Sequence, residues 1–331
     1  MMSAFKSIFK DELEEHIALR NTTSALNTRI NIRVALSNFD RYLVEIGVIE
    51  KTIDEGIVNG WIKQLLEINT SRTVSVKVSI LRKFLEYLRF CEISVFIPRR
   101  PKCTDSYVPY LFSEDEIEKI FHTVDTLEYV KSRPTSRYVR FMFPMLLRLL
   151  YGCGLRLSET LSLQISDVNL DDGVLWLKHT KCNKQRFVPM SKSLTEILRG
   201  YIAAMGLANN PNAFVFPAGK TDKKHFHRRA AEFVFIQILQ AAGIYVKPEP
   251  HKRGQCLNCF RHLFAVKSFA QAEKNGRLID DSVPFLSVYL GHSDMNGTEK
   301  YLKFNGDMFP EYIERFESYG DGVFSETLYE E

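Results

Sequence analysis

Apolar side chains recur at three- and four-residue steps along the first 93 residues. One series is Leu36, Phe39, Leu43 and Ile46, and a second is Val74, Val78, Leu81, Leu85 and Leu88. This spacing places apolar side chains on one face of a helix. No proline precedes Pro98, so these helices can run uninterrupted. The pattern therefore predicts a helical N-terminal domain over residues 1–96.

The helical period stops at residue 97. Residues 97–111 contain three prolines and three basic residues without a clear period, which is typical of a linker. Ser113 and Glu116 then form a capping-box pattern, which predicts a helix through about Thr123. We therefore expect a linker over residues 97–112 and a second domain that begins at residue 113.

The second domain is predicted to be mainly helical with one β-hairpin. We expect helices over 141–150, 226–242 and 257–265, a short one from Pro284 to Leu290, and another that carries Tyr301. Gly152 and Gly154 permit a tight turn after the first of these, and Ser158 is the expected N-cap of the helix that follows. Alternating apolar residues on both sides of Cys182-Asn183 predict a hairpin over residues 174–190, with a basic tip.

Composition places the chain among ordinary globular proteins. It has 331 residues, 45% hydrophobic and 25% charged, which suggests about two domains. The sequence contains no run of about 18 apolar residues, so it predicts no membrane span. The N-terminus lacks the apolar core of a secretory signal. The six scattered cysteines favour free thiols in a reducing compartment. We therefore expect a cytoplasmic protein without membrane contact.

The formal net charge of +4 hides two opposed parts. Residues 307–331 hold eight acidic residues and one basic residue, so the rest of the chain carries a net charge of +11. A basic body suits a nucleic-acid partner. The acidic segment also has an apolar stripe (Phe309, Tyr312, Ile313, Phe316), so we expect it to dock on protein, a neighbouring subunit being one candidate.

Five basic or nucleophilic residues stand in short motifs, and each alone is more often structural than catalytic. In chain order they are Arg156 in G-x-G-L-R-x-S-E, Lys181 on the basic hairpin, Arg261 in N-x-x-R-H, His292 in L-G-H, and Tyr301 nine residues later. Together they resemble the tyrosine recombinase (phage integrase) family. The resemblance covers essentially the whole chain, from the helical N-terminal half and basic linker to Tyr301-Leu302.

The resemblance implies a C-shaped clamp around double-stranded DNA. Residues 1–96 would be the helical core-binding domain, and residues 113–306 the mainly helical catalytic domain with a small antiparallel sheet. Family members assemble as tetramers on paired recombination sites, so we expect a homotetramer, alone or with a second recombinase. The expected reaction is site-specific recombination through a 3′-phosphotyrosyl intermediate, most simply integration or excision of a mobile element, with no cofactor and no metal.

The family roles suit the residue types. Tyr301 would be the nucleophile, and Arg156 and Arg261 would clamp the non-bridging phosphate oxygens with their guanidinium forks. Lys181 would protonate the leaving 5′-oxygen, with Lys184 as the alternative because hairpin register is uncertain by a residue. His292 would donate a hydrogen bond to the phosphate, and Glu159 would orient neighbouring groups. The expected DNA-binding residues are Arg72, Lys77, Lys83, Lys184, Arg186, Lys252 and Arg253.

One position departs from the family pattern. Asn258 stands three residues before Arg261, where the family has His or Lys. An amide can donate a hydrogen bond to a phosphate but cannot shuttle a proton. The motif therefore leaves the residue that acts as general base unassigned. Asn258 motivates one alternative, a family-derived DNA-binding protein with impaired cleavage. A type IB-like topoisomerase, which uses the same phosphotyrosine chemistry, is another. Cys256-x-x-Cys259 without a second ligand pair is weak support for zinc, and His262 is expected to be a buried packing residue.

Overall fold

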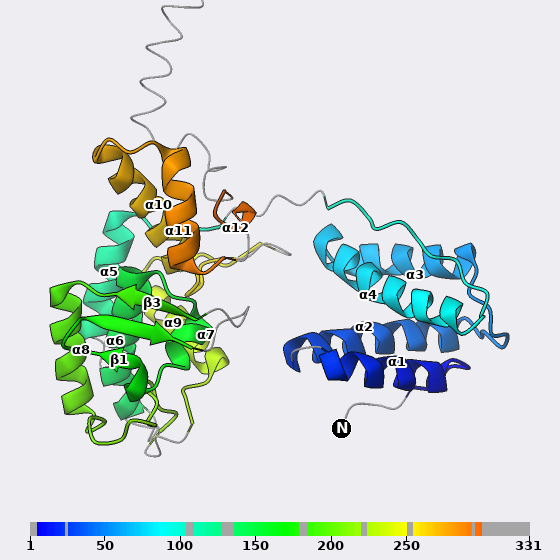
Figure 1. Cartoon of the computed structure of the whole chain (residues 1–331), viewed down its shortest axis with the longest axis horizontal. Helices are drawn as coiled ribbons and strands as arrows, with labels where there is room; N and C mark the ends of the chain where they lie inside the picture. The colour runs from blue at the N-terminus through cyan, green and yellow to red at the C-terminus, as the bar shows by residue number, and fades with distance from the viewer. Residues whose placement is uncertain are drawn as a thin grey trace, which may run out of the picture. The chain divides into compact units, whose positions relative to one another are not determined.

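The computed structural model describes residues 5–23, 26–103, 109–126, 136–178, 185–219, 224–249, 254–292 and 295–299. The chain divides into two compact units, Met1–Tyr107 and Val108–Glu331, drawn from blue to red along the chain in Figure 1. The division falls inside the stretch 97–112. The clamp geometry predicted for the two units stays a prediction.

The first unit is a bundle of four helices in its described part. They are α1 (Lys10–Thr23), α2 (Leu26–Glu45), α3 (Glu55–Ile68) and α4 (Ser71–Phe90). Helix α4 packs against the other three. The predicted stripe on α4 is fully buried, and Leu36, Phe39 and Leu43 on α2 are buried as well. Ile46 is 46% exposed, because α2 ends one residue before it.

Side-chain caps fix where α3 and α4 begin. The Asp54 carboxylate accepts the Ile57 N–H (2.8 Å), and the Thr70 hydroxyl accepts the Thr73 N–H (3.3 Å). Trp61, fully buried on α3, donates its indole N–H to Asn38 on α2 at 3.0 Å. The buried apolar side chains of the four helices form one continuous core, and the caps and the Trp61 hydrogen bond fix the helices around it.

The second unit is mainly helical and is built around α6. Its helices are α5 (Glu114–Thr126), α6 (Ser136–Cys153), α7 (Leu157–Leu161), the 3-10 turn η1 (Ile165–Asp167), α8 (Lys192–Ala204), α9 (Arg228–Ala241), α10 (Cys259–Lys274), α11 (Ile279–Leu290) and α12 (Asn296–Glu299). Helix α6 contacts α5, α7, α8 and α10, and its apolar residues from Met142 to Leu150 form the middle of the core. Helix α11 packs on α10 through Val283, Leu286 and Leu290.

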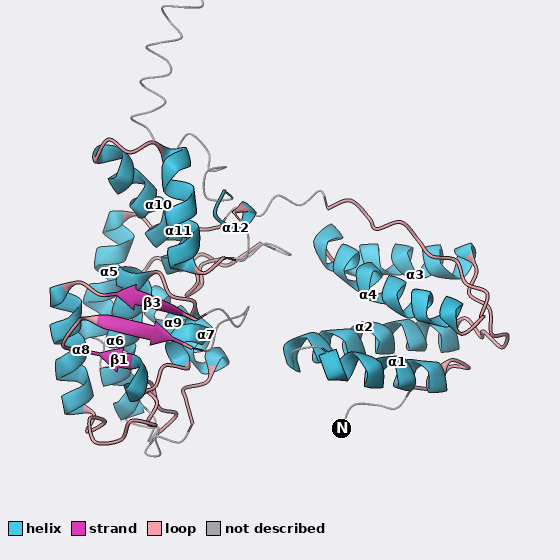
Figure 2. Cartoon of the chain, in the orientation of Figure 1, coloured by secondary structure: helices cyan, strands magenta, loops and turns pink. Residues whose placement is uncertain are grey.

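A small antiparallel sheet accompanies these helices, and Figure 2 shows its strands in magenta. The order is β1 (Val168–Asn169), β2 (Val174–Leu177) and β3 (Arg186–Pro189). Strands β2 and β3 form the predicted hairpin, with Leu177 opposite Arg186 at the last described pair. The predicted tip at Cys182-Asn183 lies outside the described residues. Strand β1 was not predicted, because two residues carry no alternating signal.

Two predicted helix starts are wrong. Arg156, not Ser158, is the N-cap of α7, because the Glu159 carboxylate reaches back to accept the Arg156 backbone N–H (3.0 Å). Pro284 does not open α11 but lies inside it. Asp280 and Asp281 in the first turn stabilise the earlier start through the helix dipole. The Ser113–Glu116 capping box is confirmed by reciprocal hydrogen bonds of 2.9 and 3.2 Å.

None of the described helices combines the length and apolar character that crossing a bilayer requires.

Candidate active site

Three arginines from different elements meet at the carboxyl end of α11. Arg186 Nε donates to the carbonyl of Tyr289 (2.8 Å), and Arg261 Nη2 donates to that of Leu290 (2.6 Å). Arg156 donates to the Leu290 and Gly291 carbonyls at 3.3 and 3.2 Å. The last carbonyls of a helix have no partner within it and carry the negative end of its dipole. The end of α11 therefore holds three like charges in one place.

Gly154 shapes the turn that carries Arg156. Its φ is +59°, and an added Cβ would lie 2.4 Å from Cδ1 of Phe264 on α10. Only glycine fits this left-handed conformation and this close approach without strain. The Gly154 carbonyl accepts a hydrogen bond from Arg261 Nη1 (2.9 Å). The turn thus places Arg156 and also anchors the second predicted catalytic arginine.

His292 follows α11 directly and joins this cluster. Arg261 Nη2 lies 3.1 Å from its Nε2, and its Nδ1 lies 2.6 Å from the hydroxyl of Thr298 on α12. A guanidinium can only donate, so Nε2 is the acceptor and Nδ1 carries the proton that is donated to Thr298. Arg261 is 5% exposed and Thr298 fully buried, so the contacts that orient the ring are largely shielded from water.

Glu159 balances the cationic cluster. Its buried carboxylate accepts from Arg156 Nη1 at 2.8 Å and from both Nη atoms of Arg186 at 3.1 and 2.9 Å. Burial raises the pKa of Glu159, but the hydrogen bonds and charges of Arg186 and Arg156 outweigh it and hold the pKa at about 2. The group is therefore ionised throughout the neutral range.

Comparisons with known proteins agree with this arrangement. A sequence model of the phage integrase family matches residues 111–306. The chain belongs to the phage integrase family. The integrase/recombinase y4rB of Sinorhizobium fredii is 30% identical over 234 residues, which cover 68% of this chain and 69% of that protein. Tyrosine recombinase XerC of Oceanobacillus iheyensis is 25% identical over 246 residues, 71% of each chain. This integrase is thus a tyrosine-type site-specific recombinase.

Solved structures share the fold. The XerH recombinase bound to palindromic difH substrate, a post-cleavage complex, matches with a TM-score of 0.67 and 17% identity over 95% of this chain and 91% of that one. A lambda integrase tetramer bound to a Holliday junction matches with a TM-score of 0.61 and 16% identity over 86% and 77%. The mainly helical fold class with a small antiparallel sheet is therefore confirmed for the integrase.

The structure brings five of the predicted site residues of the integrase together: Arg156, Glu159, Arg186, Arg261 and His292. Asn258 lies at the N-cap of α10, half-exposed and without a side-chain capping hydrogen bond. Tyr301, Lys181, Lys184, Lys252 and Arg253 lie outside the described residues. Their predicted roles, and those of the residues described, stay predictions.

The predicted DNA contacts divide into two groups. Arg72, Lys77 and Lys83 lie on α4, where Arg72 and Lys83 are exposed and Lys77 is half-buried, with its pKa lowered by burial. Arg186 is different, because its side chain is only 10% exposed and both ends of its guanidinium face Glu159. Hairpin position does not reveal this tertiary contact, and the predicted contact of Arg186 with DNA stays a prediction.

Sequence reasoning missed Thr298 and Gly291 as part of this site. Gly291, the C-cap of α11, has a φ of +66°, and an added Cβ would lie 2.8 Å from Arg186 Nη1. The L-G-H motif contained this glycine, and the left-handed C-cap it forms is a recognisable signal. Nothing in the sequence near Thr298 marked its contact with His292.

The Cys256-x-x-Cys259 pair is not part of a metal cluster among the described residues. The two sulfurs lie 3.7 Å apart, and both cysteines are free thiols, as are Cys91, Cys103 and Cys153. A hydrogen bond from Cys259 lowers the pKa of Cys256 to about 7 against the opposing effect of burial. His262 is half-buried on α10 rather than fully buried.

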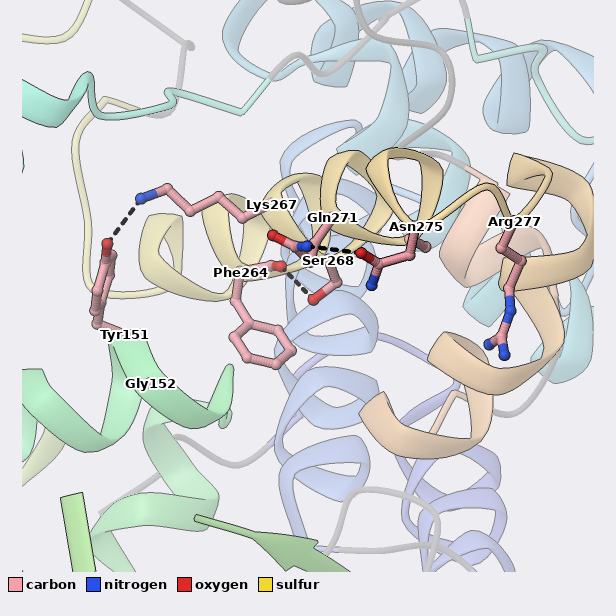
Figure 3. Close-up of a pocket in the computed structure, with 9 residues that line it drawn as sticks. Tyr151, Gly152, Phe264, Lys267, Ser268, Gln271, Asn275 and Arg277 are labelled. Carbon is pink, nitrogen blue, oxygen red and sulfur yellow. Dashed lines mark hydrogen bonds between the residues drawn. The ribbon is translucent and has the colours of Figure 1, made fainter. Parts of the chain in front are cut away.

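A separate pocket lies between α6 and α10, and Figure 3 shows its lining. Its volume is about 670 Å³, and it is lined by Tyr151, Gly152, Phe264, Lys267, Ser268, Gln271, Ala272, Asn275 and Arg277. The Lys267 ammonium donates to the Tyr151 hydroxyl (2.7 Å) and pairs with Glu114 (2.7 Å). Arg156, Arg261 and His292 do not line this pocket, so it is distinct from the arginine cluster.

Proposed function

We propose that this recombinase cleaves and rejoins duplex DNA through a covalent 3′-phosphotyrosyl bond at Tyr301, and that it integrates or excises a mobile element. One observation carries the proposal. Arg156 and Arg261, from different elements, both donate to the Leu290 carbonyl, two residues before His292. Phosphoryl transfer needs cations held rigidly where charge develops. The arginine cluster holds the guanidinium groups of Arg156 and Arg261 next to the imidazole of His292.

The reaction needs no energy source besides the DNA backbone. The Tyr301 phenolic oxygen attacks the phosphorus, the bond from phosphorus to the 5′-oxygen breaks, and the 5′-oxygen takes a proton from Lys181. Arg156 and Arg261 stabilise the charge on the non-bridging oxygens. The Arg156 side chain is 22% exposed, so a phosphate can reach it. Because the new ester replaces the old one, a second strand can reverse the steps and reseal the DNA.

The proton released by Tyr301 needs an acceptor other than Asn258, since an amide does not take up a proton near neutral pH. His292 Nε2 carries no proton in the arrangement with Thr298, and we assign it this role. Only after it has taken up the proton can Nε2 donate a hydrogen bond to the phosphate. Departure of the proton to solvent is the competing route. A cleavage rate that is insensitive to His292→Gln would favour solvent.

Double-stranded DNA is the proposed partner. The exposed cations Arg72 and Lys83 on α4 suit phosphate contacts. The structural relatives named above are an enzyme bound to difH substrate and a tetramer on a Holliday junction, which supports a homotetramer on paired sites. We assign the first unit to DNA binding, residues 113–306 to catalysis and the acidic segment 307–331 to docking on protein.

A second candidate function is a DNA-binding protein of this family that does not cleave. The observation in its favour is Asn258 itself, which stands at the start of α10 one turn before Arg261.

A nicked suicide duplex that carries the protein's own recombination site separates the candidates. Cleavage releases a short fragment and traps the protein on DNA. We expect a covalent adduct with the wild-type protein and none with Tyr301→Phe at equal DNA binding. Tight binding without any adduct would support the binding protein. An adduct that survives Tyr301→Phe would overturn the nucleophile, and site-independent relaxation of supercoils would favour a topoisomerase.

A further inference from the structure

The Arg186 side chain leaves β3 and ends at the arginine cluster. Its Nη1 and Nη2 donate to Oε1 and Oε2 of Glu159 at 3.1 and 2.9 Å, a two-pronged pairing that fixes both groups in one plane. The third contact, from Nε to the Tyr289 carbonyl (2.8 Å), ties β3 to the end of α11. All three nitrogen atoms of the Arg186 guanidinium thus donate to acceptors within the protein.

The same carboxylate positions Arg156. Glu159 Oε1 accepts from Arg156 Nη1 (2.8 Å), and Oε2 accepts from the Arg156 backbone N–H (3.0 Å). Each oxygen of Glu159 therefore serves Arg186 and Arg156 together. If Arg186 were lost, the carboxylate could rotate toward other donors, and the Arg156 guanidinium would lose its fixed orientation.

The backbone at Gly291 leaves room for the Arg186 side chain, which together with Glu159 forms a bridge to Arg156. Gly291 has a φ of +66°, and a Cβ there would lie 2.8 Å from Arg186 Nη1 and 3.2 Å from its Cδ. The residue after it is His292. The Arg186 side chain thus contacts the glycine that lies between the last turn of α11 and the catalytic histidine.

We infer that Arg186 is a positioning residue, which sets the orientation of Arg156 through Glu159 and holds the Tyr289 carbonyl near the end of α11, and does not contact DNA phosphate. This inference rests on the proposed function. It also gives the hairpin a mechanical role, because Arg186 is the first residue of β3 and stands five residues after Lys181. The bridge then fixes the base of the predicted lysine loop relative to the first catalytic arginine.

The first test compares Arg186→Gln and Arg186→Lys with Lys192→Gln, an exposed residue of α8 whose replacement removes the same charge. Single-turnover adduct formation is measured on the nicked duplex at saturating protein. We expect Arg186→Gln to slow it about a hundredfold. We expect Arg186→Lys to recover part of the rate, since an ammonium keeps one contact, and Lys192→Gln to have no effect.

Two further measurements separate positioning from phosphate binding. Loss of one phosphate contact would reduce the slope of log K against log salt by about 0.9, whereas a positioning residue leaves it unchanged. In a double-mutant cycle, Arg186→Gln should slow cleavage much less in the Glu159→Gln background than alone. The inference would be overturned if Arg186→Gln reduced the salt slope of DNA binding while it cleaved at the wild-type rate at saturating protein. It would also be overturned if the rate losses of Arg186→Gln and Glu159→Gln were fully additive.

A last measurement does not need cleavage. In protein with isotope-labelled arginine, hydrogen bonds from both Nη atoms slow rotation of a guanidinium, so resolved Nη–H signals are expected for Arg156 in the wild type. Arg186→Gln should broaden the Arg156 signals, and Lys192→Gln should not. If the wild type forms no adduct, the proposed function fails while this spectrum still decides the positioning role. Unchanged Arg156 signals in folded Arg186→Gln protein would overturn it.

Discussion

Arg261 donates from Nη2 to Nε2 of His292 across 3.1 Å, so the ring that follows α11 receives a hydrogen bond from the second of the two predicted catalytic arginines. The other ring nitrogen lies 2.6 Å from the Thr298 hydroxyl. The two contacts fix both the plane and the tautomer of the imidazole. The contact between Thr298 and His292 can be tested directly by substitution of Thr298.

Thr298→Val should slow adduct formation about ten- to a hundredfold, because the His292 ring loses the contact that holds its Nδ1 proton. Valine matches the shape of threonine in this fully buried position but lacks the hydroxyl. Rates are measured at saturating protein on the nicked duplex. Thr298→Ser keeps the hydroxyl and is the control. Equal rates for Thr298→Val and Thr298→Ser would show that the Thr298 hydroxyl does not orient the His292 ring.

Glu159→Gln should lower the free energy of unfolding by about 3 kcal/mol at pH 7, because it leaves Arg156 and Arg186 without their buried counter-charge. The exposed Glu196→Gln, which removes a surface ion pair with Arg199, should cost less than about 1 kcal/mol. Urea unfolding followed by circular dichroism measures both. Equal losses would mean that Glu159 contributes no more than a surface charge.

The Glu159 contribution should also depend on pH in one direction. Its pKa is about 2 in the folded protein, below the ordinary value of about 4.3, so the ionised group stabilises the fold. That stability is full above the unfolded pKa and is lost as the pH falls through the folded pKa. The difference between wild type and Glu159→Gln should therefore be constant from pH 9 to about 5 and shrink toward pH 2. A difference that grows on acidification would contradict this.

Gly154→Ala should destabilise the protein by about 3 kcal/mol, since it adds a left-handed alanine and a contact of 2.4 Å with Phe264. Gly206→Ala is the matched control. Gly206 also has a positive φ, +67°, but an added Cβ meets nothing within 4 Å, so about 1 kcal/mol is expected. Thermal unfolding compares the two. Similar shifts would show that backbone strain alone, and not the Phe264 contact, makes Gly154 necessary.

Acid should weaken the first unit through His16. Burial, then the charges of Arg20 and Lys83, lower the pKa of His16 to about 4. A base with a lowered folded pKa stabilises the fold above its unfolded pKa of about 6.5 and loses that stability as the pH falls toward 4. At about 1.4 kcal/mol per pKa unit, the loss reaches about 3 kcal/mol. His16→Phe should flatten the profile of melting temperature between pH 7 and 4.

Cys256 should be the more reactive thiol of its pair. Its pKa of about 7 comes mainly from the hydrogen bond of Cys259, against the effect of burial. The alkylation rate by iodoacetamide should therefore rise through pH 7, and Cys259→Ala should move the midpoint up by about one unit. Buried Cys153, whose pKa burial raises to about 12, should stay unmodified. Peptide mass spectrometry resolves the sites.

The parts of the fold that were predictable depend on local chemistry. The stripes on α2 and α4, the capping box before α5 and the β2–β3 hairpin each follow from residues close together in sequence. The errors arose where a nearby side chain competed with the pattern. Glu159 reaches back to Arg156 and makes it the N-cap in place of Ser158. The acidic first turn and the packing of Val283 on α10 start α11 before Pro284.

The candidate site was predictable as a set of residues but not as an arrangement. The motifs around Arg156, Arg261 and His292 were enough for the family resemblance, because catalysis restricts the residue types at each position. The role of Arg186 was not predictable, because a basic residue beside a hairpin tip has the same local pattern whether it faces solvent or a buried carboxylate.

The sequence by itself determined the helical fold class, the family and the identity of the candidate catalytic residues, since periodicity and motif spacing are local properties of the chain. Only the tertiary structure decided which carboxylate and which carbonyls hold the arginines. The bond from Arg186 to Glu159 spans 27 residues, and that from Arg156 to Gly291 spans 135. Such contacts form when α6, α10, α11 and β3 pack on one core, which brings the end of α11 and the Glu159 carboxylate to the same three guanidinium groups.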